Sequence, residues 1–139
     1  KFIKARKSFF NRFGQPINPS NVKQGDLIAV KLTLENSEKS NVENVALADI
    51  LPAGFEIENS RIGEVADMNW IKDQAFEDYL DVRDDRITFF THAELKPRSF
   101  YYLVRAVSTG TFKMGPVSAD AMYNGEYHSY HGAQTIIVR

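Results

Sequence analysis

The alternation of apolar and polar residues along this chain is typical of β-strands. In residues 26–35, DLIAVKLTLE, every second residue from Ile28 to Leu34 is apolar, and polar residues such as Lys31 fall between them. A period of two places these sets on opposite faces of a half-buried strand, whereas a helix would scatter them. Further extended runs, each bounded by Pro, Gly, Asn or Ser, occupy residues 42–54, 55–58, 86–95, 98–107, 110–117 and 134–139.

This spacing predicts an all-β chain that forms an antiparallel two-sheet β-sandwich of about seven to eight strands. One stretch, MNWIKDQAFEDYL at 68–80, departs from the alternation, and we expect one short helical insertion there. Its apolar residues Trp70 and Ile71, together with Ala75 and Phe76, are then expected to cover an end of the core.

Aromatic residues are concentrated in two of the predicted strands. They are Phe89, Phe90, Phe100, Tyr101 and Tyr102. Alternate rings of a sandwich strand fill the core and the others lie against the opposite face, so we interpret these residues as packing residues. A carbohydrate-binding sandwich, which is the alternative, would need its aromatic rings coplanar on one exposed face.

Length and composition limit the class of protein. The 139 residues, of which 43% are hydrophobic, suit one core, so we expect residues 1–139 to form a single domain. A formal charge of −1 offers no excess of cations to phosphates, so nucleic acid is not expected as a partner. No apolar run approaches the ~20 residues that span a bilayer, so direct membrane contact is not expected either.

The chain begins with Lys and enters a strand pattern almost at once, which we interpret as a piece excised from a longer polypeptide.

The sequence carries no recognisable catalytic motif. Without cysteine, it has neither a thiolate nucleophile nor a thiolate metal ligand. Asp84 and Asp85 are adjacent and point to opposite faces of a strand, unlike the facing carboxylates of a glycosidase. We expect instead a turn within DVRDDR (81–86) in which one of them bonds nearby backbone or Arg86. A G-x-S-x-G elbow and a glycine-rich phosphate loop are both absent, so we expect no enzyme activity and no cofactor.

The polar stretch SADAMYNGEYHSYHG at 118–132 raises the question of a metal site. His128 and His131 have an H-x-x-H spacing, with Asp120 and Glu126 close by in sequence. No helix is predicted to hold the pair, and a zinc site needs a third ligand on a rigid scaffold. We interpret the two histidines as loop residues exposed to water, and we expect no metal.

Three segments in a fixed order resemble a known family. VALADILPAGFEIENSRI (45–62), VRDDRITFF (82–90) and YYLVRAVSTGTFKMGPVSADAMY (101–123) are similar to the last macroglobulin-type domain of bacterial alpha-2-macroglobulins. The opening RKSFFNRFGQPI (6–17) and the QGDLIAVKLTL strand also resemble that domain, so the similarity covers nearly the whole chain. LPAG alone is a weak signal, whereas the ordered set of three is specific.

The resemblance implies a noncatalytic role in a broad-spectrum protease-trapping inhibitor. Members of this family are large periplasmic proteins, usually anchored to the inner membrane through a lipidated N-terminus. A protease cleaves a bait segment, and an internal thioester in a separate domain then acylates a lysine of that protease. The C-x-E-Q thioester motif is expected upstream, because this chain has no cysteine. The implied partners are the thioester domain and other neighbouring domains of the same parent chain, and target proteases through the full-length parent.

The resemblance also implies a contact site. In the family, the loop after the A-x-x-M-Y segment resembles a lid that keeps water off the thioester, and Met122 and Tyr123 match that motif. Methionine supplies adaptable apolar contact, and tyrosine adds a ring with a hydroxyl donor. Past Tyr123 the sequence departs from the family pattern, and Asn124 and Tyr127 extend the predicted contact loop. The alternative is that Met122 and Tyr123 only end a strand and close the edge of this domain's own core.

A second resemblance gives a different class of protein. The segment VENVALADILPAGFEI is also similar to Ig-like repeat modules of bacterial surface proteins, which form spacers or adhesive stalks. The R-D-D-R and A-x-x-M-Y segments favour the macroglobulin resemblance, because the stalk modules need neither of them.

Overall fold

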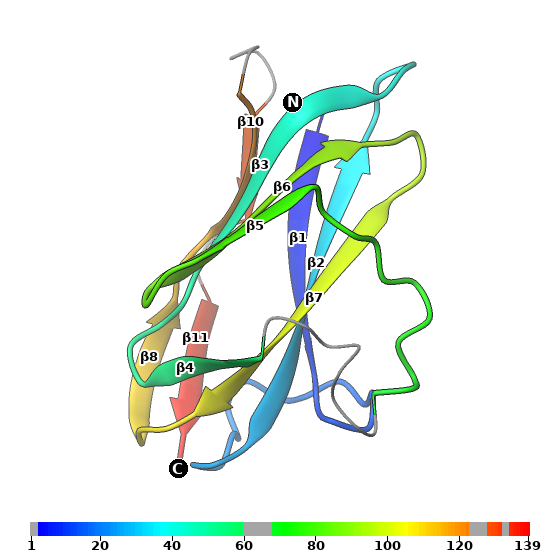
Figure 1. Ribbon diagram of the computed structural model, residues 1–139. Helices are drawn as coiled ribbons and strands as arrows, with labels where there is room; N and C mark the ends of the chain where they lie inside the picture. The colour runs from blue at the N-terminus through cyan, green and yellow to red at the C-terminus, as the bar shows by residue number, and fades with distance from the viewer. Residues whose placement is uncertain (1–2, 60–67, 123–127, 132–133) are drawn as a thin grey trace.

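The computed structural model describes residues 3–59, 68–122, 128–131 and 134–139, and two antiparallel sheets face each other in it (Figure 1). The first sheet has the order β1-β2-β7-β4, formed by Ile3–Phe10, Leu27–Asn36, Arg98–Ala106 and Phe55–Asn59. The second sheet has the order β10-β9-β3-β6-β5, formed by His128–His131, Val117–Ala121, Val42–Ile50, Arg86–Ala93 and Tyr79–Val82. A small sheet pairs β8 (Gly110–Met114) with β11 (Gln134–Val138). The predicted all-β sandwich is therefore confirmed.

In these described segments no helix is long and apolar enough to cross a membrane.

The core lies between the two large sheets, where the sequence period of two places it. Ile28, Val30 and Leu32 of β2 are buried in one cluster with Ile87 and Phe89 of β6. These side chains come from alternate positions of their strands, as the pattern of residues 26–35 predicts. Burial of each such large apolar side chain stabilises the fold by about 1.5–3 kcal/mol.

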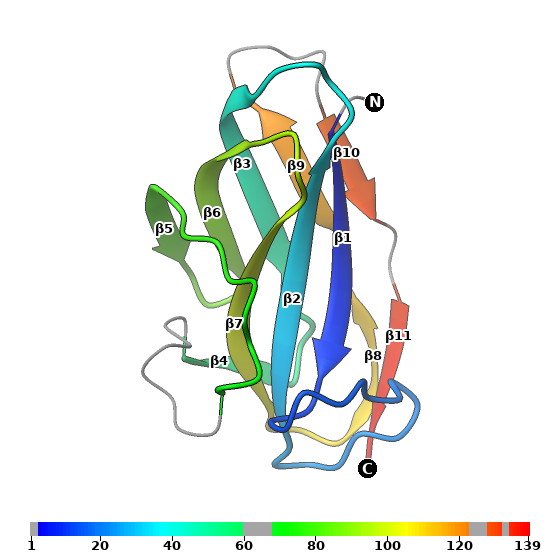
Figure 2. The same cartoon turned by 90° about the vertical axis from the view of Figure 1, so that its right-hand side faces the viewer.

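The outer face of the first sheet is also buried, which the alternation did not predict. Ala29 of β2 and Tyr101 and Leu103 of β7 form a second apolar cluster on that side. Residues 68–78, called the strap below, run across this face, and Trp70 packs against the cluster (Figure 2). The first sheet is thus covered on both sides, by the second sheet and by the strap.

The predicted helical insertion at 68–80 is wrong. The strap begins with one turn, in which the N–H of Ile71 donates to the carbonyl of Met68 at 3.2 Å, and no helix follows before β5. The N–H of Ala75 donates to the carbonyl of Ser99 at 2.7 Å, so the strap bonds to β7. The apolar outer face of the sheet needs a cover, and β7 offers a backbone acceptor that a self-bonded helix would leave unused.

The side chains of the strap follow the prediction only in part. Trp70 and Ile71 do cover apolar surface, but they lie on the outer face of the first sheet rather than at an end of the core. Ala75 packs against the main core. Phe76 is 73% exposed and covers nothing in the described structure.

The aromatic residues of β6 and β7 serve packing, as predicted. Phe89, Phe100 and Tyr102 are buried in the main core. Tyr101 is buried under the strap. Phe90 lies on the other face of β6, where its ring centroid is 5.7 Å from that of Tyr79.

Candidate functional site at the β9–β10 end of the sandwich

Met122 directly follows β9, at the end of the sandwich where β9 ends (Figure 2). Its backbone N–H donates to the carbonyl of Asn44 at 2.8 Å. Asn44 has a φ of 58°, a left-handed conformation that asparagine tolerates better than most residues. The β3–β6 pairing shifts register between Val42 and Val45, and such a bulge bends a strand and redirects its neighbours. The backbone at Met122 is therefore positioned by an irregularity in β3.

The side chain of Met122 points away from the core. Along β9 the residues Val117, Ala119 and Ala121 are buried, and Asp120 between them is exposed. Met122 continues this alternation on the outer face and is 46% exposed. A large apolar side chain on a fixed backbone thus faces solvent at this end of the sandwich.

The rest of the predicted contact loop lies outside the described residues. Tyr123, Asn124 and Tyr127 belong to it, and their roles stay predictions. His128 and His131 lie in β10, whose backbone pairs with β9, so the prediction that they are loop residues is wrong. Their side chains are outside the description. Among the His, Asp and Glu side chains that are described, no three are grouped closely enough to hold a metal ion.

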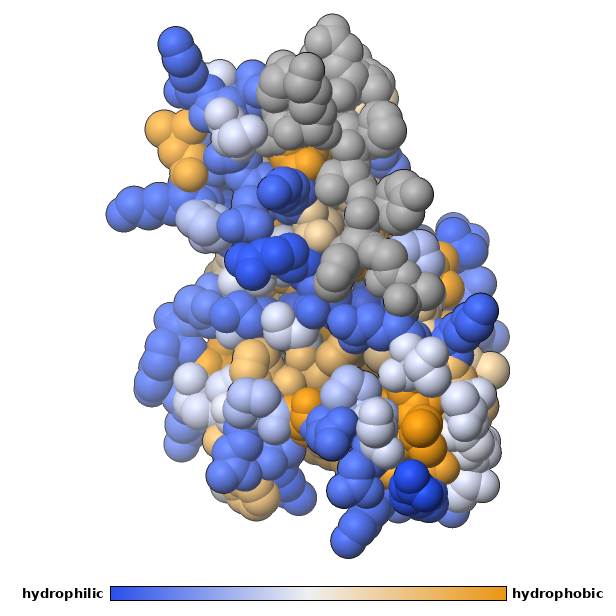
Figure 3. All heavy atoms as spheres, turned by 180° about the vertical axis from the view of Figure 1, so that it is seen from behind, coloured by the Kyte–Doolittle hydropathy of each residue, from blue (hydrophilic) through white to orange (hydrophobic). Residues whose placement is uncertain are grey.

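Exposed apolar residues occur at several separate places on the molecule. Seen from behind, polar side chains cover much of the surface, and apolar patches interrupt them, the larger ones in the lower half of the view (Figure 3). The large exposed apolar residues of the described chain are Phe13, Phe76, Tyr79, Val82, Leu95 and Met122. Of these, Met122 alone belongs to the predicted contact loop.

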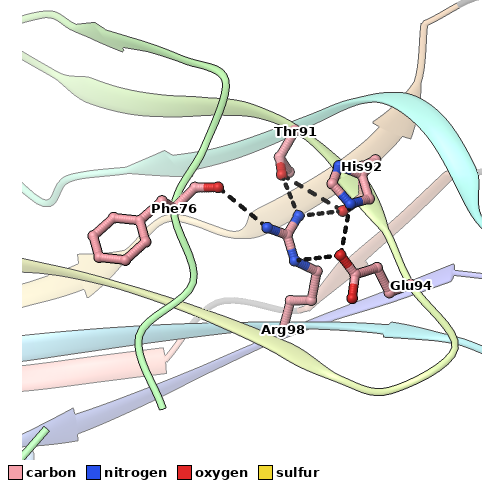
Figure 4. A network of polar contacts seen from close by, with 5 residues as sticks. All are labelled: Phe76, Thr91, His92, Glu94 and Arg98. Carbon is pink, nitrogen blue, oxygen red and sulfur yellow. Dashed lines mark hydrogen bonds and ion pairs between the residues drawn. The ribbon is translucent and has the colours of Figure 1, made fainter. Parts of the chain in front are cut away.

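Arg98 at the start of β7 holds the strap to the β6–β7 hairpin (Figure 4). Its Nη2 donates to the carbonyl of Phe76 at 3.1 Å, and its Nη1 donates to Thr91 Oγ1 at 2.6 Å and to the carbonyl of His92 at 2.7 Å. His92 Nε2 lies 2.7 Å from Glu94 Oε2, and this hydrogen bond lowers the pKa of Glu94. The guanidinium therefore joins two segments distant in sequence, which is a structural role.

The acidic segment 81–86 forms a turn, as predicted. The carboxylate of Asp85 lies 3.3 Å from the guanidinium of Arg86, and the N–H of Arg83 donates to the carbonyl of Arg86 at 2.8 Å. The hydrogen bond from Arg86 lowers the pKa of Asp85. Asp81 Oδ2 accepts a hydrogen bond from Arg83 Nε at 3.0 Å. The carboxylates of Asp81 and Asp85 therefore pair with arginines of the same turn and do not face each other across a cleft.

A group of polar residues in the core was not predicted. Lys7 of β1 donates from Nζ to Asp49 Oδ1 of β3 at 2.5 Å and to the carbonyl of Gly115 at 3.1 Å. The hydroxyl of Tyr102 in β7 donates to Asp49 Oδ2. Burial raises the pKa of Asp49 despite the opposing influence of Lys7 and Tyr102, and burial also raises the pKa of Tyr102. We call Lys7, Asp49 and Tyr102 the core polar cluster.

The sequence did contain a signal for this cluster. Lys7 is in phase with the buried Ala5 and Phe9 of its strand, and Asp49 is in phase with the buried Leu47. A charged residue at the apolar phase of a strand predicts a buried charge, and buried charges are normally paired. Which two residues pair across the sheets depends on strand order, which local periodicity does not contain.

The comparison with known families decides between the two resemblances. Residues 3–126 match the family described as Bacterial Alpha-2-macroglobulin MG10 domain. The chain belongs to this family. The MG10 domain belongs to a noncatalytic family, so the expectation of no enzyme activity is confirmed and the stalk module is not supported.

Relatives and solved structures agree with this assignment. The alpha-2-macroglobulin of Rickettsia conorii is 30% identical over 140 residues, which cover 95% of this chain and 7% of that protein. Salmonella alpha-2-macroglobulin reacted with methylamine matches with a TM-score of 0.85 and 28% identity over 99% of this chain and 9% of that chain. Escherichia coli alpha-2-macroglobulin activated by porcine elastase matches with a TM-score of 0.85 and 26% identity, covering 100% of this chain and 13% of that chain. The MG10 chain described here spans about 7% of the length of the first curated relatives it matches.

Proposed function

We propose that this MG10 domain packs against the thioester domain of a full-length bacterial alpha-2-macroglobulin and shields the thioester from water until a protease cleaves the inhibitor. The contact is made by Met122 and Tyr123, extended by Asn124 and Tyr127. The domain performs no chemistry itself. Its contribution is to exclude water from a bond that hydrolyses readily, and a dry cover of apolar and aromatic groups suits that purpose.

The observation that carries this proposal is the position of Met122. If Met122 only closed the edge of its own core, its side chain would be buried next to Ala121. It is instead 46% exposed on a backbone that Asn44 holds in place. An exposed, adaptable apolar side chain on a fixed backbone is suited to contact with another domain.

The relatives support the chemistry of the proposal. The Salmonella protein is described as reacted with methylamine, and an amine nucleophile cleaves a thioester and releases a thiol. The Escherichia coli protein is activated by porcine elastase, which is a protease. We infer that the parent of this chain acts on proteases in the same way, in the periplasm, as a lipoprotein anchored to the inner membrane.

The experiment uses the full-length parent protein. Methylamine treatment should release one thiol per chain, which establishes the thioester. Tyr123→Gly, and separately Met122→Gly, should then increase the rate of spontaneous thiol release in buffer without methylamine. Because the domain stays folded in both variants, its circular dichroism should not change.

Phe13→Ala is the matched control, because Phe13 is an exposed aromatic residue in the β1–β2 loop at the opposite end of the sandwich (Figure 2). This variant should keep the wild-type thioester lifetime. A wild-type lifetime in both glycine variants would contradict the shielding role, and so would a parent protein from which methylamine releases no thiol.

A further inference from the structure

The core polar cluster places an amine against a carboxyl group in a site from which water is excluded. The Lys7 side chain is 6% exposed and the Asp49 side chain 1% exposed. Lys7 Nζ lies 2.5 Å from Asp49 Oδ1, so the amine is adjacent to the carboxyl carbon that bears this oxygen. The two residues belong to β1 in the first sheet and β3 in the second sheet. They therefore meet between the two large sheets.

Burial disfavours the charged form of the Asp49 carboxyl group. Removing an ammonium and a carboxylate from water is costly, and their mutual attraction offsets that cost only in part. Transfer of one proton from Lys7 to Asp49 gives an amine and a carboxylic acid, neither of which carries a charge. Burial raises the pKa of the Asp49 carboxyl, which is the direction this transfer requires.

We propose that Lys7 and Asp49 condense to an intramolecular amide bond that covalently joins β1 to β3. The neutral Lys7 amine attacks the carboxyl carbon of protonated Asp49, and the C–N bond forms. The C–Oδ1 bond then breaks. Oδ1 leaves as water, with one hydrogen from the carboxyl group and one from the amine. The step involves no oxidation and needs no co-reactant.

The surroundings of the pair favour this reaction over the simple ion pair. The hydroxyl of Tyr102 donates to Asp49 Oδ2, the oxygen that gains negative charge when the amine attacks, so it acts as an oxyanion donor. The carbonyl of Gly115 accepts from Lys7 Nζ at 3.1 Å and orients the amine. Because the fold holds the amine and the carboxyl group together, the reaction avoids the entropy cost of bringing them together from solution. Exclusion of water from the site opposes hydrolysis of the amide.

The product satisfies the same hydrogen-bonding groups as the reactants. The amide N–H can donate to the carbonyl of Gly115, and the amide oxygen, derived from Oδ2, can accept from Tyr102. Two buried charges are removed. The bond links residues 42 positions apart in a chain that has no cysteine for a disulfide. In an inhibitor that meets proteases, such a covalent link limits unfolding of this domain.

Peptide mapping of the natural full-length protein tests the proposal without any variant. After denaturation and trypsin digestion, we expect peptide 7–12, KSFFNR, joined to peptide 40–61, SNVENVALADILPAGFEIENSR. The joined mass should equal the sum of the two peptides less one water molecule, and fragmentation should locate the link at Lys7 and Asp49. Free peptide 8–12 with unmodified peptide 40–61, and no joined species, would overturn the proposal.

The same digest contains an internal control. Lys31 Nζ lies 3.0 Å from Asp73 Oδ2, but both side chains are partly exposed, so this pair should stay an ion pair. Trypsin should therefore cut after Lys31 and release peptide 24–31. A link at this pair equal in amount to that at Lys7 would contradict the role assigned to burial.

Variants of the full-length protein separate amide chemistry from charge pairing. Lys7→Arg keeps a cation but should abolish the link. Asp49→Asn should retain it, because attack on the side-chain amide releases ammonia and gives the same product. Tyr102→Phe should slow formation of the link by about 10²–10³-fold, the usual effect of losing one oxyanion donor. A link that survives in Lys7→Arg would overturn the assignment to Lys7.

Discussion

At Gly54 the chain turns from β3 into β4 with a φ of +85°, a left-handed conformation that favours glycine. The position also lacks space. A Cβ on Gly54 would lie 2.6 Å from Phe112 Cζ. The ring of Phe112 in turn packs edge-on against Phe55, with centroids 6.1 Å apart. Gly54 therefore allows the turn and also allows the small sheet to approach β4.

Gly54→Ala should destabilise the domain for both reasons. The left-handed conformation costs an alanine about 1–2 kcal/mol, and displacement of Phe112 adds to it. Gly25→Ala is the matched control, because Gly25 has a φ of +94° but nothing within 4 Å of the added Cβ. Urea unfolding should show a larger loss for Gly54→Ala than for Gly25→Ala. Equal losses of stability in the two variants would mean that the contact with Phe112 contributes nothing to the effect.

At the scale of elements, the strap is the part of this fold that tertiary contacts determine most strongly. The indole Nε1 of Trp70 donates to the carbonyl of Arg12 at 2.8 Å. Its ring contacts Phe10 and Tyr101, with centroid separations of 5.6 and 6.2 Å. Asp73 accepts from the hydroxyl of Tyr101 at 2.6 Å. These contacts join the strap to the first sheet and to the β1–β2 loop, so the strap's position depends on both.

Trp70→Ala should loosen the strap and destabilise the domain by about 2–4 kcal/mol, because the ring is part of the second apolar cluster. Phe76→Ala, in the same segment but with a 73% exposed side chain, should change stability by less than about 0.5 kcal/mol. Limited trypsin digestion should cut after Lys72 faster in Trp70→Ala than in Phe76→Ala. Equal rates of cutting would show that Trp70 does not hold the strap.

At the scale of the whole molecule, β7 joins two apolar layers. Tyr102 points into the main core and Tyr101 points under the strap, so adjacent residues of one strand serve opposite faces. Burial raises the pKa of both phenols, and Asp49 and Asp73 raise them further. Ionisation of Tyr101 in the folded protein would place a negative charge beside the carboxylate of Asp73, and ionisation of Tyr102 would place one inside the core.

The stability of the domain should therefore fall at alkaline pH. For a group whose pKa is higher in the folded state, the stabilisation is complete below the unfolded pKa, near 10.0, and is lost as pH rises toward the folded pKa. The free energy of unfolding in urea should therefore decrease as the pH rises above about 10. Tyr101→Phe should make this decrease shallower, because one such phenol is removed. An unchanged slope would contradict the role of Tyr101.

Local patterns in the sequence predicted most of the strands but not β5, β10, the strap or the core polar cluster. Residues 26–35 became β2 because alternation is a property of neighbouring residues, which the sequence displays directly. Trp70 and Ile71 were correctly seen as covering residues, but a helical arrangement was expected because the acceptor at Ser99 is distant in sequence. Lys7 and Asp49 each broke the apolar phase of a strand, yet their pairing required the order of strands in both sheets.

The amino-acid sequence by itself determined the all-β class, the positions of most strands, the acidic turn and the family, because each of these depends on local periodicity or on ordered motifs. Only the tertiary structure decided that Met122 faces solvent, that the strap covers the first sheet and that Lys7 meets Asp49 in the core. The physical reason is that exposure and pairing are properties of two surfaces brought together. A strand's own pattern specifies which face is apolar, whereas the segment that covers that face is specified by the packing of the whole chain.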